Sequence, residues 1–155
     1  MSATQIVLVV LVILAFAFGW IASERRGRTG RWSALLGGGE PAADATITAA
    51  LTAYQAVLAV WQSGASWSPL LARALDTFDE RRQAAGSLQL GADAGPEARA
   101  ALDRAQTALT RLGEGLAPLR QGMPLRPDHE RQLAGQERRL AAARTALILA
   151  SQRRD

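Results

Sequence analysis

The sequence contains no cysteine and no lysine, and each absence excludes whole classes of chemistry. Without cysteine the chain has no thiol nucleophile, no disulfide and no cysteine-ligated metal centre. Without lysine it lacks the residue that a Walker A phosphate loop or a pyridoxal Schiff base requires. The single histidine, His129, cannot supply a two-histidine metal site within one chain. We therefore predict no metal site, no cofactor site, no catalytic residues and no enzymatic activity.

Aromatic residues are scarce, at 5% of the chain, and β-branched residues thin out after the N-terminal segment. Alanine and leucine dominate instead, with 32 and 22 copies. Both are strong helix formers, whereas strands favour β-branched and aromatic side chains. The composition therefore predicts an all-α protein.

Charge is absent from the beginning of the chain, since residues 2–23 contain no ionisable side chain. At about 1.5 Å per residue, a helix of this length spans roughly 33 Å, enough for the hydrocarbon core of a bilayer. A cleaved signal peptide would need a basic N-terminal region and an apolar core of about 7 to 15 residues. Residues 2–5 carry no charge, and the apolar run 6–22 is longer than that. We predict an uncleaved transmembrane anchor over residues 1–23.

Basic residues follow this segment and none precedes it. Positive charge is retained on the cytoplasmic side, so the pattern predicts an inner-membrane protein with its N-terminus outside and its C-terminal domain in the cytoplasm. Trp32 can sit among lipid headgroups while the arginines contact phosphates. The predicted membrane-surface residues are Arg25, Arg26, Arg28, Arg31 and Trp32.

Two further features flank the predicted anchor. Residues 24–40 include Gly37-Gly38-Gly39, which marks the boundary of a Gly/Arg-rich linker. Within the span, Ala15, Gly19 and Ser23 recur every four residues on one helix face. Small residues at this spacing allow two membrane helices to pack closely, so the row could serve homo-oligomerisation, although small residues are also common in spans generally.

Residues 41–155 carry four helical patterns separated by Gly, Ser and Pro. The patterns begin after Pro41, at Ser68-Pro69, near Gly95-Pro96 and at Pro127-Asp128, where Ser68 and Asp128 are candidate N-caps. Glycines and a proline near residue 115 predict a bend or fraying there. The predicted apolar stripes are Ile47, Leu51, Tyr54, Leu58 and Trp61; Leu71, Leu75, Phe78 and Ala85; Ala98, Leu102, Ala105, Leu109, Leu112, Leu116 and Leu119; and Leu133, Leu140, Ala143, Leu147 and Ala150.

Short connections between consecutive helices favour antiparallel neighbours, so we predict an up-down-up-down four-helix bundle. A three-helix bundle with one helix packed elsewhere is the main alternative. The first and third connections would then share one end of the bundle. That end would carry Trp67, Met123 and Leu125, which are candidate partner-binding residues because such side chains are frequent at interface centres; equally, Trp67 could fold back as a lid on the core.

The charged residues of this domain predict a solvated surface of mixed sign. Residues 41–155 contain 14 arginines and 12 acidic residues, a difference of two. This is too balanced for a nucleic-acid-binding face. Asp76, Asp79 and Glu80 cluster beside Arg81 and Arg82 on one helix, and a charged outer face explains them better than a catalytic site. His129 is expected to be an exposed residue at the start of the last helix.

These inferences predict a membrane-anchored helical protein that binds another protein or helps to scaffold a membrane complex. The alternative is a sensor or envelope protein whose helical domain lies outside the cytoplasm and binds a ligand. The side of the membrane on which the C-terminus lies separates the two. The sequence identifies neither the partner nor the process.

Overall fold

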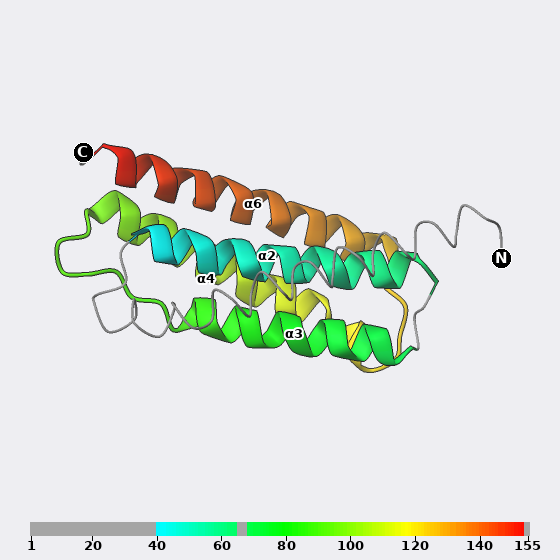
Figure 1. The fold of residues 1–155 in the computed structure, drawn as a ribbon. Helices are drawn as coiled ribbons and strands as arrows, with labels where there is room; N and C mark the ends of the chain where they lie inside the picture. The colour runs from blue at the N-terminus through cyan, green and yellow to red at the C-terminus, as the bar shows by residue number, and fades with distance from the viewer. Residues whose placement is uncertain (1–39, 65–67, 154–155) are drawn as a thin grey trace, which may run out of the picture. The chain divides into compact units, whose positions relative to one another are not determined.

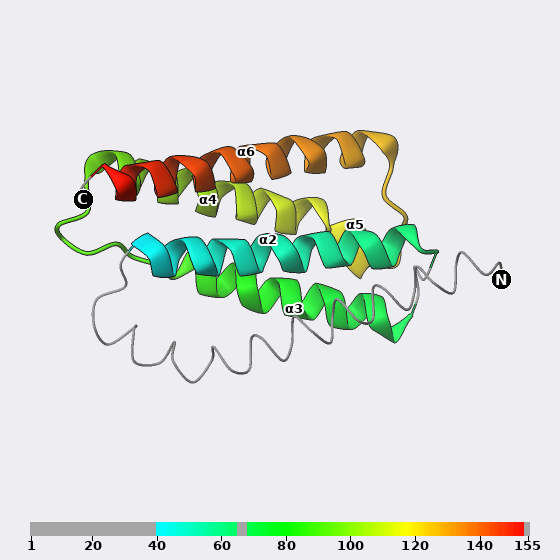
Figure 2. The same cartoon turned by 45° about the horizontal axis from the view of Figure 1, so that its top comes forward.

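The computed structural model describes residues 40–64 and 68–153, and every element in them is helical. The chain divides into two compact units, Met1–Gly37 and Gly38–Asp155. The second unit contains the helices α2 (Glu40–Gln62), α3 (Pro69–Gly86), α4 (Pro96–Gly115), α5 (Ala117–Arg120) and α6 (Pro127–Gln152). Figures 1 and 2 show the four long helices lying alongside one another. The predicted all-α class is confirmed for the described residues.

Several predictions made for the N-terminal part fall outside the described residues. They concern the anchor, most of the linker, the membrane-surface residues and the small-residue row. Trp67 also lies outside them. The residues concerned are Arg25, Arg26, Arg28, Arg31, Trp32, Ala15, Gly19, Ser23 and Trp67.

Helix α3 begins and ends where the sequence predicts. Ser68 adopts an extended backbone, and its hydroxyl accepts a hydrogen bond from the Leu71 N–H at 3.4 Å. Pro69 occupies the first helical position, where its missing N–H costs no intrahelical bond. Four predicted stripe residues of α3 are buried in the core: Leu71, Leu75, Phe78 and Ala85.

Helix α4 ends at Gly115, and α5 continues after a one-residue break at Leu116. Two glycines in the last turn allow close packing. A Cβ on Gly115 would lie 2.6 Å from Leu133 Cδ2, and one on Gly113 would lie 2.9 Å from Arg82 Nε. Neither glycine has a positive φ. Glycine is therefore needed here because neighbouring side chains leave no room for a Cβ, and not because of the backbone conformation. The helix is interrupted at Leu116, where the sequence predicts a bend or fraying. All seven residues of the third stripe are buried.

Helix α6 has a different cap from the predicted one. Its N-cap is Arg126, which makes no side-chain capping bond, and Pro127 takes the first helical position. Asp128 therefore lies inside the first turn, where its charge favours the helix N-terminus, and it pairs with Arg131. The stripe of α6 follows the prediction, since Leu133, Leu140, Ala143, Leu147 and Ala150 are all buried.

The stripe predicted for α2 is only partly correct. Ile47 and Tyr54 are buried, but Leu51, Leu58 and Trp61 are half-buried at the edge of the core. Because α2 contacts both α3 and α6, its buried face is broad. It includes small side chains that lie outside the stripe predicted from periodicity. The additional buried positions are Ala43, Ala50, Ala53, Val57 and Val60.

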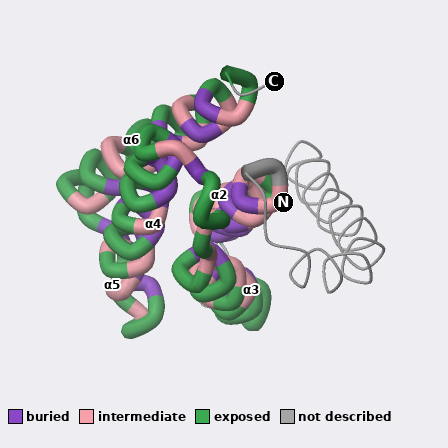
Figure 3. Tube along the Cα trace, turned by 90° about the vertical axis from the view of Figure 1, so that its left-hand side faces the viewer, coloured by how far each residue is buried: buried purple, intermediate pink, exposed green. Residues whose placement is uncertain are grey.

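One core connects the long helices. Helix α4 packs against α6, and α2 against α3, while α2 also contacts α6 and α3 contacts α4. Tyr54 and Phe78 meet at its centre, with ring centroids 6.1 Å apart. Figure 3 shows buried and exposed stretches alternating along the helices. Many core positions are alanines, which allow helices to approach closely because they add little side-chain volume.

Long-range contacts define how the helices run past one another. Asp44 pairs with Arg144 at 2.7 Å, and farther along α2, Gln55 donates to Glu137 at 3.0 Å. On α4, Glu97 pairs with Arg153, whereas Gly115 lies against Leu133. In both cases, moving forward along one helix means moving backward along α6.

Gln106 fixes α4 against the end of α3. Its side-chain amide donates to the carbonyl oxygens of Ala85, Gly86 and Leu88 at 3.0, 3.3 and 3.1 Å. The last carbonyls of a helix have no donor within the helix itself. The Ala85 carbonyl also accepts from the Leu88 N–H at 3.3 Å, and the Gln106 side chain adds its bonds to those of the backbone there. Leu88 and Leu90 then cover this end of the core.

Candidate interaction surfaces

Helix α2 is, over Ala42–Gln62, long and apolar enough to cross a membrane, judged by length and composition within the described residues. A helix at the centre of a water-soluble domain has the same properties. Ile47, Tyr54 and Val57 on this helix are fully buried. Burial in the core accounts for part of the apolar character of α2, since 39% of its most apolar window is buried.

Of the acidic cluster predicted on α3, Asp79 forms two ion pairs at the surface. Asp79 contacts Arg82 Nε at 3.4 Å and Arg120 Nη1 at 2.5 Å, so it joins α3 to α5. The three side chains are between a quarter and a third exposed. Asp76 and Glu80 are exposed on the same helix. Within the described residues, no group of three or more His, Asp or Glu side chains could hold a metal ion.

Two buried polar atoms have no hydrogen-bond partner in the described part of the chain, the Tyr54 hydroxyl and His129 Nδ1. Burial raises the pKa of the Tyr54 phenol above its ordinary value, and the nearby Glu137 carboxylate raises it further. His129 is half-buried, so the expectation of an exposed residue is wrong; part of its ring packs against the domain. No second titratable side chain is bonded to either atom.

The predicted partner-binding residues do not share one environment. Met123 is 48% exposed, as a surface residue should be, but Leu125 is only 6% exposed and belongs to the core. Leu125 therefore acts as a lid, because the connection from α5 to α6 turns its side chain inward. Sequence reasoning missed Leu70, which is 54% exposed beside the buried Leu71. Leu70 lies one residue outside the predicted α3 stripe, and this position could have indicated its exposure.

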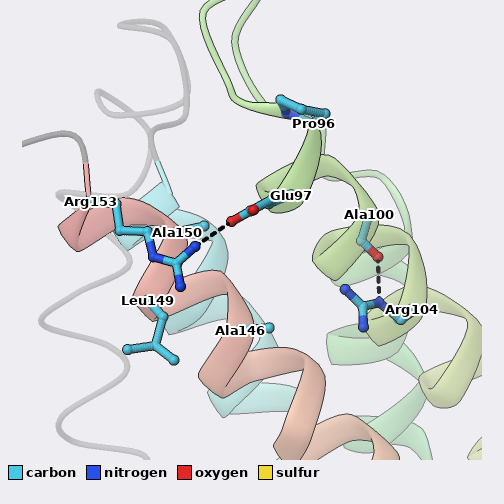
Figure 4. Close-up of a pocket in the computed structure, with 8 residues that line it drawn as sticks. All are labelled: Pro96, Glu97, Ala100, Arg104, Ala146, Leu149, Ala150 and Arg153. Carbon is cyan, nitrogen blue, oxygen red and sulfur yellow. Dashed lines mark hydrogen bonds and ion pairs between the residues drawn. The ribbon is translucent and has the colours of Figure 1, made fainter.

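A groove runs between α4 and α6 near the end of α6 (Figure 4). Ala100, Ala146 and Ala150 line it with apolar atoms, and its volume is about 540 Å³. Leu149, 49% exposed, stands at one edge. Glu97 and Arg153 form a bridge of 3.0 Å across it, and Arg104 is held back by its bond to the Ala100 carbonyl. Small residues thus form the floor of the groove, and charged residues form its rim.

Comparison with known proteins gives no match. No family model matches the chain, and no curated protein or solved structure is significantly similar to it. The geometry of the surfaces is therefore the basis for a functional proposal.

Of the residues that line the groove, the predicted apolar stripes contain only Ala150, on α6. Ala100 gave no signal, because an exposed alanine on a helix is ordinary. The groove depends on which faces of α4 and α6 diverge, and periodicity within one helix does not contain that information.

Proposed function

We propose that the chain is a single-pass membrane protein whose C-terminal domain is an up-down-up-down four-helix bundle that binds another protein. The opposed order of contacts along α2 and α6, and along α4 and α6, supports the antiparallel arrangement. The apolar, uncharged segment 2–23 and the arginines after it support a membrane anchor with a cytoplasmic bundle.

The groove between α4 and α6 is the observation that carries the interaction proposal. Small residues on its floor allow a partner's helix to approach closely, and Leu149 offers an exposed apolar contact at its edge. The charged rim would select partners whose charges complement Arg104, Arg153 and Glu97. A helix of the partner lying in this groove is the contact that we propose.

Site-specific photo-crosslinking tests this contact, and the chain suits the method because it has no cysteine. Leu149→Cys carries the photoreactive label at the groove. Met123→Cys is a matched control, since the two native side chains are 49% and 48% exposed. We expect a discrete crosslinked partner from position 149 in native membranes. Capture at neither position would refute protein binding at these sites, and capture at position 123 alone would move the interface to the opposite end.

A blocking variant checks that the groove itself is occupied. Ala146 is half-buried in the groove lining, so Ala146→Arg should fill the space and abolish capture from position 149. Thr107→Arg is the control, because Thr107 is exposed on α4 and does not line the groove. Equal loss of capture in both variants would contradict a groove-specific contact.

The alternative function is a sensor or envelope protein with its bundle outside the cytoplasm. The groove between α4 and α6, with apolar alanines on its floor and charged side chains at its rim, is the observation in its favour. Reporter fusions at Asp155 distinguish the two functions. A cytoplasmic reporter should be active there, whereas an active phosphatase fusion in the periplasm would refute the cytoplasmic topology and favour the alternative.

A further inference from the structure

The exposed charges in the first half of helix α4 form a pattern that is complementary to its own reverse. In chain order they are Glu97, Arg99, Asp103 and Arg104, and the exposed Ala100 lies near their midpoint. Glu97 and Arg104 are seven residues apart, so they share a face of the helix, and both line the groove against α6 with Ala100 between them (Figure 4). If the segment is turned end for end, each negative charge comes level with a positive one.

The other charges on and near α4 do not oppose this pattern. Arg111 and Glu114 lie toward the C-terminal end of α4, and the same reversal brings them level with residues 87–90, which carry no charge. Asp93, in the connection before the helix, comes level with Ala108, which is buried. No pair of like charges is therefore brought together along α4.

The charges of this pattern are available for a partner. Arg99, Asp103 and Arg104 form no ion pair with another described residue. Each arginine donates one N–H to a nearby backbone carbonyl, which leaves the rest of its guanidinium for a carboxylate. Glu97 binds Arg153 through Oε2, and both side chains are 70% exposed, so Oε1 can accept from a second arginine.

We propose that the partner in the groove is a second copy of this chain, whose α4 packs antiparallel to α4 around a two-fold axis near Ala100. This deepens the proposed function, on which it rests, by naming the partner. Glu97 then faces Arg104 of the second copy, Arg99 faces Asp103, and the symmetry makes each pair twice. A parallel arrangement would set like charges against one another, so the charges select the antiparallel one.

Small and apolar side chains lie at the centre of this contact. Ala100 adds little volume, so the two α4 helices can approach closely. Because Glu97 of α4 bonds to Arg153 of α6, residue 100 is level with Ala150, beside Leu149. Leu149 is one of three large apolar side chains exposed in the described residues, and a helix in the groove would remove it from water.

The membrane anchor compensates for the small size of the contact. A stable dimer of soluble proteins buries about 800 Å² on each partner, which the first turns of two helices do not supply. Two chains anchored in one membrane meet at a high effective concentration, so a weak contact between their bundles is sufficient. The dimer is therefore expected for the full-length protein in its membrane.

Disulfide formation in membranes tests the position of the axis, because the chain has no cysteine of its own. Ala100→Cys places the two thiols level with each other. Thr107→Cys, also exposed on α4, separates them by about 20 Å along the helices, too far for a disulfide. After oxidation of membranes that contain the full-length variants, we expect a linked dimer from position 100 only. Equal yields at the two positions, or no dimer at position 100, would overturn the proposal.

Charge reversal in the Ala100→Cys protein tests the pairing. Glu97→Arg and Arg104→Glu should each lower the dimer yield about tenfold, because one substitution alters two symmetry-related exposed pairs. When the two variants carry different tags and are produced together, mixed dimers should recover, since each mixed contact again joins opposite charges. Arg111→Glu is the control and should not change the yield. Unchanged yields in both single variants, or no recovery in mixed dimers, would contradict the charge pairing.

The photo-crosslinking from position 149 separates this proposal from the proposed function. A product that contains two copies of the chain supports both. Capture of a different protein, or capture from position 123 alone, contradicts the second copy and leaves a protein partner in place. Capture at neither position contradicts both.

Discussion

Replacing Gly115 by alanine should destabilise the domain, although the same change usually stabilises a helix. The new Cβ would lie 2.6 Å from Leu133 Cδ2 and 3.3 Å from Leu133 Cγ, whereas carbon atoms in contact prefer about 3.5 to 4.0 Å. Leu133 is 2% exposed, so its side chain has little freedom to rotate away. A shift of roughly 1 Å is therefore needed in a packed interior, and such overpacking costs about 1 to 3 kcal/mol.

The opposing term is helix propensity, which favours alanine over glycine by at most about 1 kcal/mol within a helix. Because Gly115 is the last residue of α4, the gain there is smaller. We expect a net loss of about 1 to 2 kcal/mol in the free energy of unfolding. Urea denaturation followed by circular dichroism, on a fragment covering residues 38–155, measures it.

Gly135→Ala is the matched control. Gly135 lies inside α6, and a Cβ there would meet nothing within 4 Å, so this variant should be more stable than the parent by about 0.5 to 1 kcal/mol. Leu133→Ala should also lower the free energy of unfolding less in the Gly115→Ala variant than in the parent, because truncation of the Leu133 side chain relieves the clash. If Gly115→Ala proves as stable as the parent, the close approach of α4 and α6 is not the reason for this glycine.

Three other substitutions test the interior. Gln106→Ala removes three hydrogen bonds to the end of α3 and should lower the free energy of unfolding, measured by urea denaturation, by about 1 to 3 kcal/mol. Amide exchange near Ser87 should become faster, and an unchanged exchange rate would contradict this role of Gln106. Tyr54→Phe deletes a buried hydroxyl without a partner and should leave stability unchanged or raise it. Because the folded pKa of Tyr54 is raised above its ordinary value of 10.0, the parent should lose stability as the pH rises above about 10, and a Tyr54→Phe variant that keeps all of this loss would refute the assignment. Leu109→Asp places a charge at a position 1% exposed and should cost several kcal/mol; a cooperative, parent-like unfolding transition would show that α4 is not central.

The sequence was sufficient for helices whose boundaries are set locally. Ser68 and Pro69 define the start of α3 through one hydroxyl and one ring, and neither depends on distant residues. The third stripe was predicted in full because α4 carries charge on its outer face and leucine or alanine within. Local signals and tertiary packing agree there, so periodicity alone identifies the core.

Prediction failed where tertiary packing decided the outcome. On α2 the apolar residues surround the helix, so periodicity could not tell that Val57 would be buried and Leu58 only half-buried. Leu125 lies in a connection, which suggested exposure, but its segment turns back over the core. Asp128 was a good cap by residue type, yet Pro127 takes the first helical position, two residues earlier than a cap at Asp128 would give, so Asp128 lies inside the first turn.

The charge-free stretch of α2 has a consequence for the order of synthesis. From residue 45 to residue 72 the chain carries no ionisable side chain except that of Tyr54, and Ala42–Gln62 is apolar and long enough to cross a bilayer. A ribosome that has reached Gln62 has made this helix but none of α3, α4 or α6. The apolar face of α2 therefore stays without its partners until α3 and α6, the helices that contact it in the structure, have been made.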